Sequence, residues 1–304
     1  MSLLSDILRR TRADVEERRS RLPLSELRRR AKDMPPTRSL KQALSNGFGI
    51  IGEIKSRSPS AGEMNSRNVA DALDIYNACP IVTAISVLTD EPFFGGSLGQ
   101  LRAVHEATSK PVLRKDFIID EYQVWEAKAY GADAILLMGA VHEEQPSRLK
   151  DLYELAKSLG LEALVEIGMS QAGPQQQAAI VPRDAEIWGI NSRKFHSSPF
   201  KLRMRVSKWL GRDLTTYASR HRQLRGLIPP GKIAVAESGI HQPRQIDALI
   251  HLRYDAALIG TAFLKGPLRV ADVVSAFAER IANLKQAAAD IAHPDLAWQR
   301  TAPR

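Results

Sequence analysis

The sequence lacks the features that mark several common protein classes. Cys79 is the single cysteine among 304 residues, which excludes an intrachain disulfide and favours a cytoplasmic location. No apolar run approaches the roughly 18 residues of a membrane span, and the first residues do not resemble a secretory signal. No glycine-rich nucleotide loop and no paired His or Cys spacing of a metal site occurs. We therefore expect no membrane contact, no metal and no cofactor.

Positive charge is concentrated in two segments of the chain. The formal net charge is +9, of which residues 1–45 contribute +6 and residues 199–226 contribute +7, so the remainder is slightly acidic. A nucleic-acid-binding protein would more typically present a continuous basic face with aromatic side chains or a known binding motif. We therefore expect no nucleic-acid partner.

Short apolar runs alternate with amphipathic segments after residue 45. Such runs, uninterrupted and rich in β-branched residues, are typical of parallel strands that are buried on both faces. Eight repeats predict an α/β fold of the (β/α)8 TIM-barrel type. The rival is a doubly wound open sheet, but the glycine-rich first turn typical of that fold is missing. The runs are Phe48–Ile51, Ile81–Val87, Pro111–Leu113, Ala134–Leu137, Ala163–Val165, Ile187–Ile190, Lys232–Ala236 and Ala256–Ile259.

The flanking segments differ from this pattern. Residues 1–45 have apolar residues at helical spacing and arginines on the other face, with breaks at Pro23 and at Pro35-Pro36. We expect an N-terminal helical extension over residues 1–45, a barrel over residues 46–290 and a tail over residues 291–304. The sixth and seventh strands are unusually far apart, which indicates an insertion at about 199–226. It could be a lid, an interface or a solvated basic helix, and we favour the helix.

Polar residues stand at the carboxyl ends of seven of the eight runs. In a TIM barrel these ends meet on one face, where such enzymes carry their chemistry. Glu53 and Lys55 are two residues apart on one strand, so their side chains point to the same face. A solvated ion pair would explain one such ending but not seven. The polar residues at or just after these ends include Glu53, Lys55, Lys115, Glu166, Asn191, Glu237 and Ser238.

Glycines follow the last two strands. Gly239 comes after the seventh run, and Gly260 and Thr261 come after the eighth. This is the position at which barrels bind phosphate with backbone N–H groups, although Gly-Thr can also simply begin a helix. Lysines and glutamates without metal ligands suggest proton transfer on a small phosphorylated molecule. The seven histidines fall on expected helices or loops, and we interpret them as surface or packing residues.

Several segments resemble the indole-3-glycerol phosphate synthase family of tryptophan biosynthesis. They follow the family's order over residues 48–264, and the first and third of those given below are highly specific. The resemblance also explains the N-terminal helix, which in this family lies near the barrel mouth. The segments are Ile51–Lys55 with Ser58–Ser60, Ser86–Asp90 with Phe94–Ser97, Pro111–Ile119, Ala129–Leu137, Leu164–Glu166, Gly189–Arg193, Ala236–Ile240 and Leu258–Thr261.

The resemblance implies a lyase that closes a ring with loss of carbon dioxide and water. Its substrate would be 1-(2-carboxyphenylamino)-1-deoxyribulose 5-phosphate. Lys115 would be the general acid, Lys55 would hold the substrate carboxylate, and Glu166 would be the general base. The remaining assignments are Glu53 and Glu237 for lysine protonation and substrate hydroxyls, Asn191 and Ser238 for positioning, Arg193, Gly239, Gly260 and Thr261 for phosphate, and Phe94 and Phe117 for packing on the substrate ring. We expect a monomer or weak homo-oligomer.

The chain departs from the family pattern at a few positions. Ala61 replaces a usual lysine, Ser192 a usual asparagine and Thr261 a usual serine. One alternative function is a repurposed barrel that binds a phosphorylated metabolite without synthase activity and contacts a partner through its insertion. Another is a barrel isomerase with a Cys/Asp pair, but Cys79 precedes the second strand instead of following the first.

Overall fold

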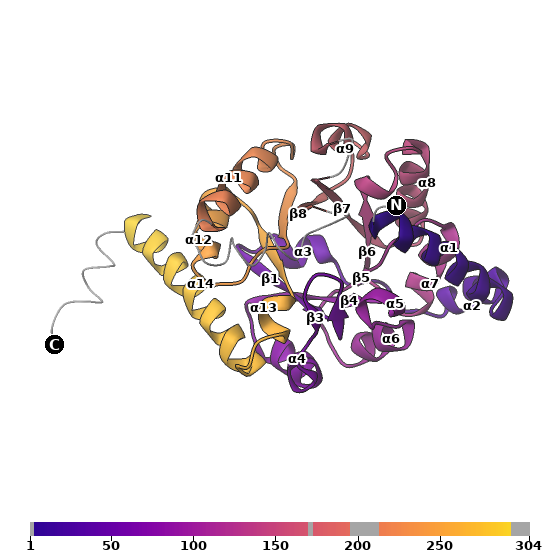
Figure 1. Cartoon of the computed structure of the whole chain (residues 1–304), viewed down its shortest axis with the longest axis horizontal. Helices are drawn as coiled ribbons and strands as arrows, with labels where there is room; N and C mark the ends of the chain where they lie inside the picture. Colours follow the sequence, from indigo (N-terminus) through magenta and orange to yellow (C-terminus); the bar gives the residue numbers. More distant parts are fainter. Residues whose placement is uncertain (1–2, 170–172, 195–212, 293–304) are drawn as a thin grey trace.

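A computed structural model describes residues 3–169, 173–194 and 213–292 of the chain. Eight parallel strands form a closed barrel in the order β1-β10-β9-β8-β7-β6-β5-β4 (Figure 1). The (β/α)8 prediction is therefore confirmed. The strands are β1 (Gly49–Ile54), β4 (Val82–Leu88), β5 (Val112–Lys115), β6 (Ala134–Met138), β7 (Glu162–Met169), β8 (Ile187–Lys194), β9 (Ile233–Glu237) and β10 (Ala256–Ile259).

A helix follows each barrel strand and packs around it (Figure 1). Local signals set the helix ends: the Asn65 side chain accepts hydrogen bonds from the first N–H groups of α4, and Asp120 and Gln123 form a capping box on α7. Gly131 and Gly160 adopt positive φ just after α7 and α8, as helix stops require. The helices are α4 (Ser66–Ala78), α6 (Leu98–Glu106), α7 (Glu121–Ala129), α8 (Pro146–Ser158), α9 (Pro174–Ile180), α11 (Asp213–Arg225), α12 (Gln245–His251) and α14 (Val270–Ala292).

Shorter elements occupy the connections. The Ser58-Pro59-Ser60 turn joins two very short antiparallel strands, β2 (Arg57–Ser58) and β3 (Gly62–Glu63). Three short helical turns, α5 (Glu91–Phe94), η1 (Gly139–Val141) and α13 (Thr261–Leu264), follow β4, β6 and β10. All of these elements follow the carboxyl ends of strands, so they surround the barrel mouth.

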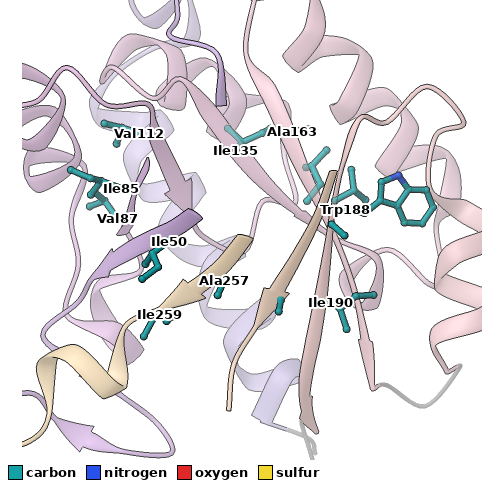
Figure 2. Close-up of a cluster of buried hydrophobic side chains, with 14 of the residues drawn as sticks. Ile50, Ile85, Val87, Val112, Ile135, Ala163, Trp188, Ile190, Ala257 and Ile259 are labelled. Carbon is teal, nitrogen blue, oxygen red and sulfur yellow. The ribbon is translucent and has the colours of Figure 1, made fainter. Parts of the chain in front are cut away.

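Two apolar layers stabilise the barrel. Outward-pointing residues such as Ile50, Ile85 and Ile259 pack between the strands and the helices (Figure 2). Alternate residues, among them Ile51 and Leu113, fill the barrel interior. This interior changes from apolar to charged toward the carboxyl ends of the strands, where the buried polar residues include glutamates and lysines.

The N-terminal extension is helical, as predicted, and packs on the barrel. It consists of α1 (Leu3–Arg21), α2 (Leu24–Lys32) and α3 (Leu40–Leu44), with breaks at the predicted prolines. Ion pairs fasten α1 to the region of α7: Arg18 Nε lies 2.6 Å from Glu126 Oε1, and an Arg19 nitrogen lies 2.6 Å from Asp120 Oδ1. Ile7 joins the same apolar cluster as the barrel interior.

Cationic side chains secure the opposite end of the barrel, where the strands begin. Lys110 Nζ donates hydrogen bonds to the carbonyls of Tyr76, Cys79 and Val82. Arg38 donates to the carbonyls of Thr108 and Lys110, at 2.6 and 2.8 Å. The bonds of Lys110 tie the carboxyl end of α4 to the start of β4.

Seven of the eight barrel strands extend beyond the apolar runs that predicted them, and β7 and β8 extend furthest. The apolar runs stop where the barrel interior becomes charged, but backbone pairing does not depend on the side chain and continues. Five of the seven catalytic candidates therefore lie on the strands themselves, and the other two, Lys55 and Ser238, directly follow β1 and β9.

The predicted insertion is only partly described, since residues 195–212 lie outside the described ranges. Its second half forms α11, in which His221 and Leu224 are fully or almost fully buried. His221 Nδ1 lies 2.9 Å from the Tyr254 hydroxyl. This half is therefore a helix that packs on the barrel, and the expectation of a merely solvated helix is wrong for it. Among the described residues, no helix is long and apolar enough to cross a membrane.

Candidate active site

A cavity opens at the carboxyl ends of the strands, and all eight barrel strands or the residues just after them contribute to its wall. Twelve of the thirteen site residues that the sequence predicts line it. The thirteenth, Arg193, lies on β8, but its side chain is outside the described part of the structure. The twelve are Glu53, Lys55, Phe94, Lys115, Phe117, Glu166, Asn191, Glu237, Ser238, Gly239, Gly260 and Thr261.

Lys115 lies between two buried carboxylates inside the cavity. Its Nζ atom is 3.5 Å from Glu166 Oε2 and 3.3 Å from Glu237 Oε2. Burial opposes the charge of Lys115, but Glu237, Glu166 and Glu53 outweigh burial and raise its pKa. Burial also raises the pKa of Glu237, with Glu166 adding to the rise and Lys115 opposing it. The raised pKa of Glu237 makes this carboxylate easier to protonate than an exposed glutamate.

A second pair, Glu53 and Lys55, occupies β1 and the residue after it. The Lys55 ammonium donates a hydrogen bond to Glu53 Oε1, and both side chains are buried. The predicted common orientation of these two side chains is therefore confirmed. Since Glu53 also lies close enough to Lys115 to raise its pKa, the two lysine–carboxylate groups form one continuous charged layer.

Two glycines make room for the buried carboxylates. A Cβ atom at Gly189 would overlap Glu237 Oε1, and a Cβ atom at Gly260 would overlap Glu53 Oε1. Sequence reasoning assigned Gly260 to phosphate and gave Gly189 no role. The sequence signal that could have found Gly189 is its place on β8, two residues before Asn191, where the strand must pass a charged neighbour.

The backbone turns sharply where phosphate binding is predicted. Ser238 and Gly239 have φ values of +66° and +75°. A left-handed conformation is unfavourable for a serine and persists only where surrounding contacts impose it. The Ser192 hydroxyl donates to the Ser238 carbonyl at 3.1 Å, and the Gln245 side chain donates to the Gly239 carbonyl at 2.9 Å. Thr261 begins α13 on the neighbouring strand end.

The opposite part of the wall is apolar. The rings of Phe94 and Phe117 lie 6.2 Å apart between centroids, at an interplanar angle of 38°. Leu136 and Met138 of β6 also line the cavity. A wall of this kind suits a flat aromatic group, while the charged layer and the turn after β9 suit its polar substituents.

Comparison with known proteins agrees with this geometry. The family model described as indole-3-glycerol phosphate synthase matches residues 4–274. The chain belongs to this family. Membership assigns the chain to the carboxy-lyases of tryptophan biosynthesis, as the sequence resemblance predicted.

Curated relatives share the family name over most of their length. The indole-3-glycerol phosphate synthase of Kineococcus radiotolerans is 37% identical over 285 residues, which cover 91% of this chain and 96% of that protein. The one from Bacteroides thetaiotaomicron is 35% identical over 266 residues, which cover 87% of this chain and 94% of that protein. This chain therefore spans nearly the whole of these relatives.

Solved structures support the fold alone. Phosphoribosyl anthranilate isomerase from Thermococcus kodakaraensis has a TM-score of 0.52 at 11% identity and covers 78% of this chain and 99% of its own. A 3-hexulose-6-phosphate synthase has a TM-score of 0.51 at 17% identity, covering 77% of this chain and 99% of its own. In this chain Cys79 follows α4 and is not part of the cavity wall, so it does not supply the cysteine of an isomerase.

Two features near the mouth were not predicted from the sequence. His241 lines the cavity just after the Ser238-Gly239 turn, although the sequence placed it with packing or surface histidines. Lys265 donates a hydrogen bond to the carbonyl of Ala61, the position where the family usually carries lysine. An ammonium group therefore stands at this turn despite the substitution.

No group of three or more His, Cys, Asp or Glu residues that could hold a metal ion occurs within the described ranges.

Proposed function

We propose that this chain closes the indole ring of its product by acid–base catalysis with Lys115 and Glu166. The substrate would be 1-(2-carboxyphenylamino)-1-deoxyribulose 5-phosphate, and the product indole-3-glycerol phosphate. The observation that carries the proposal is the position of Lys115, between Glu166 and Glu237 in a cavity with an apolar wall on one side and the Ser238-Gly239 turn on the other.

The two ends of the cavity would orient the substrate. Its aromatic ring would pack on Phe94 and Phe117, and the Lys55 ammonium would bind the ring carboxylate. Its phosphate would accept hydrogen bonds from the backbone around Gly239, Gly260 and Thr261, with Arg193 as an added charge. Such fixed placement of both reacting carbons in one molecule lowers the entropic cost of ring closure.

Lys115 would act first, as the general acid. The ring carbon that carries the carboxylate attacks the substrate ketone, and Lys115 protonates the ketone oxygen as the carbon–carbon bond forms. The carboxylates that raise the pKa of Lys115 keep its ammonium protonated at neutral pH, so the group carries the proton that the ketone oxygen takes up. Loss of carbon dioxide then restores the aromatic ring.

Glu166 would act in the final dehydration. The nitrogen lone pair helps to expel the new hydroxyl group, which takes a proton from a lysine ammonium of the site and leaves as water, and Glu166 removes a proton from the adjacent carbon to complete the indole. Glu53 and Glu237 would stabilise positive charge on the nitrogen and set the protonation of the lysines. Asn191 and Ser238 would position the substrate hydroxyls.

The organisation of the chain completes the proposal. We propose an N-terminal extension over residues 1–45, a barrel over residues 46–290 and a tail over residues 291–304, in a cytoplasmic enzyme that is a monomer or weak homo-oligomer. Sedimentation at several protein concentrations tests the oligomeric state, and a stable dimer at nanomolar concentration would contradict it.

A direct fluorescence assay tests the proposed reaction. Purified protein is mixed with the carboxyphenylamino substrate, and the appearance of indole fluorescence is followed together with the release of carbon dioxide. We expect both at equal rates. Tight binding of the substrate without either signal would instead favour the repurposed phosphate-binding barrel and overturn the proposal.

A further inference from the structure

The backbone around Lys115 is held by the strand ladder on one side. The register between β4 and β5 reaches Leu88 and Lys115, and the Lys115 carbonyl accepts the Thr89 N–H at 3.2 Å. The register between β5 and β6 ends one residue earlier, at Arg114 and Ile135. Something besides the ladder must therefore fix the angle at which Lys115 enters the cavity.

Side chains on the outer face of β5 supply this support. Strand alternation directs Arg114 and Asp116 away from the interior that Lys115 faces. Arg114 is 1% exposed, and its Nη2 donates to Asp116 Oδ2 at 2.8 Å. The Thr89 hydroxyl donates to the same Asp116 oxygen at 2.6 Å and accepts from Arg114 Nε at 3.0 Å. The three groups form a closed triangle behind Lys115.

The triangle also reaches the backbone beyond Lys115. Asp116 Oδ1 accepts the N–H of Phe117 at 2.8 Å, so both oxygens of this carboxylate are engaged within the protein. Burial opposes the charge of Asp116, but Arg114 and Thr89 outweigh burial and lower its pKa. Asp116 touches the cavity wall, yet its hydrogen bonds face the triangle.

A second layer ties the triangle to the surrounding helices. Arg114 Nη1 donates to the Gln123 carbonyl of α7 at 2.7 Å, and Nη2 reaches Glu126 Oε2 at 3.2 Å. The other Glu126 oxygen accepts from Arg18 of α1 at 2.6 Å. The guanidinium of Arg114 thus has partners just after β4, just after β5 and on α7. Several charge-assisted hydrogen bonds from different directions keep a buried charge in one geometry.

We propose that Arg114, Asp116 and Thr89 are positioning residues, which act on catalysis by fixing the strand end that carries Lys115. The inference deepens the proposed function and rests on it, because it takes Lys115 as the general acid. None of the three is assigned a contact with substrate, so their effect should appear in turnover and not in substrate binding.

The charges around Lys115 give this role a pH signature. Lys115 is faced by Glu53 and Lys55 from the β1 side, by Glu166 of β7 and by Glu237 of β9. These carboxylates raise the pKa of Lys115, so a small displacement of the ammonium from them lowers that pKa. A general acid with a lower pKa loses its proton at lower pH. The pH at which kcat begins to fall on the alkaline side therefore becomes lower.

Thr89 offers a matched pair of variants. Thr89→Val removes the hydroxyl at nearly constant shape, whereas Thr89→Ser keeps it. We expect Thr89→Val to lower kcat by about 10- to 100-fold, the range for a displacement of about 1 Å at a reacting group. KM should stay within about twofold, the alkaline limb should move to lower pH, and Thr89→Ser should restore all three values toward those of the unsubstituted chain.

Two outcomes would overturn the inference. Equal kcat values for Thr89→Val and Thr89→Ser would show that the hydroxyl does not support Lys115, and a rise in KM at unchanged kcat would show a role in binding. Circular dichroism establishes that each variant is folded at the assay temperature. If Thr89→Val does not fold, Asp116→Asn carries the same expectations, because it removes the charge and keeps the shape.

A readout without substrate separates the inference from the proposed function. The side-chain nitrogen of Lys115 can be observed by NMR at neutral pH in protein labelled with ¹⁵N-lysine, with its signal assigned by its loss in Lys115→Met. A chemical shift that changes in Thr89→Val and returns in Thr89→Ser supports positioning even if the chain forms no indole product. An unchanged shift in Thr89→Val in an active enzyme overturns positioning and leaves the proposed function in place.

Discussion

Lys115 is the counter-charge of two buried carboxylates and, in the proposed reaction, the proton donor. We expect Lys115→Met to lower turnover at least about 100-fold, within the range of a lost general acid, as measured by indole fluorescence at saturating substrate. The matched control is Lys41→Met, which removes a surface lysine paired with Glu186. Near-normal turnover in Lys115→Met would rule out Lys115 as the general acid.

A larger side chain at Gly189 would disturb the buried carboxylate of Glu237. The added methyl group of Gly189→Ala overlaps Glu237 Oε1, so the carboxylate must leave the position in which it pairs with Lys115. We expect a loss of activity together with a loss of about 1–3 kcal/mol in the free energy of unfolding. Gly99→Ala on α6 is the control, because its nearest neighbour would be Ser97 Oγ at 3.8 Å and a helical alanine is favourable. Full activity in Gly189→Ala would show that the position of the Glu237 carboxylate next to Gly189 is not needed for activity.

At the scale of elements, Asn68 joins α4 to the segment before α14. Its side chain accepts the Val270 N–H at 3.0 Å and donates to the Leu268 carbonyl at 2.8 Å, and the residue is 2% exposed. Asn68→Ala leaves these backbone groups without a partner, so we expect a loss of about 2–4 kcal/mol in urea denaturation. The exposed Asn46→Ala should stay within about 0.5 kcal/mol. Equal stabilities of the two variants would contradict the role of Asn68.

The barrel strands were predictable because each combines an apolar run with a helix that follows it. Their ends were not, since Glu166 and Asn191 interrupt the apolar pattern while the backbone pairing continues past them. The β2–β3 hairpin was predictable only as a turn at Ser58–Ser60, because each of its strands has two residues. Periodicity cannot reveal elements this short.

The site was predictable to the extent that its chemistry is carried by charged side chains at strand ends. Glu53, Lys115 and Glu237 follow this rule and meet in the cavity. Gly189 and the Arg114 triangle do not follow it, since one acts through missing volume and the other from the outer face of β5. Both depend on packing across elements far apart in the sequence, and a sequence pattern does not contain that information.

At the scale of the whole molecule, a buried histidine couples stability to pH. Burial lowers the pKa of His142 to about 4 from its ordinary 6.5, with the nearby Arg148 adding to this effect against the Ile118 carbonyl. Because the folded pKa is the lower one, the stabilisation is fully present above pH 6.5 and is lost as the pH falls toward 4.

His142→Gln removes this titration and keeps a donor for the Ile118 carbonyl. Between about pH 6 and 4.5, the unsubstituted chain should lose up to about 1.4 kcal/mol per pH unit more in unfolding free energy than the variant. Urea denaturation across this range measures the difference. Parallel stability profiles would show that His142 takes up its proton without unfolding.

The hydrogen bonds of Lys110 at the closed end of the barrel have a consequence for chemical reactivity. Its ammonium donates hydrogen bonds to the carbonyls of Tyr76, Cys79 and Val82, so the amine becomes a free nucleophile for an acylating reagent only when these bonds break. Exposed lysines such as Lys41 have no such set of carbonyl bonds to break. The rate at which Lys110 is labelled therefore reports how often these bonds break, at a place far from the cavity where substrate would bind.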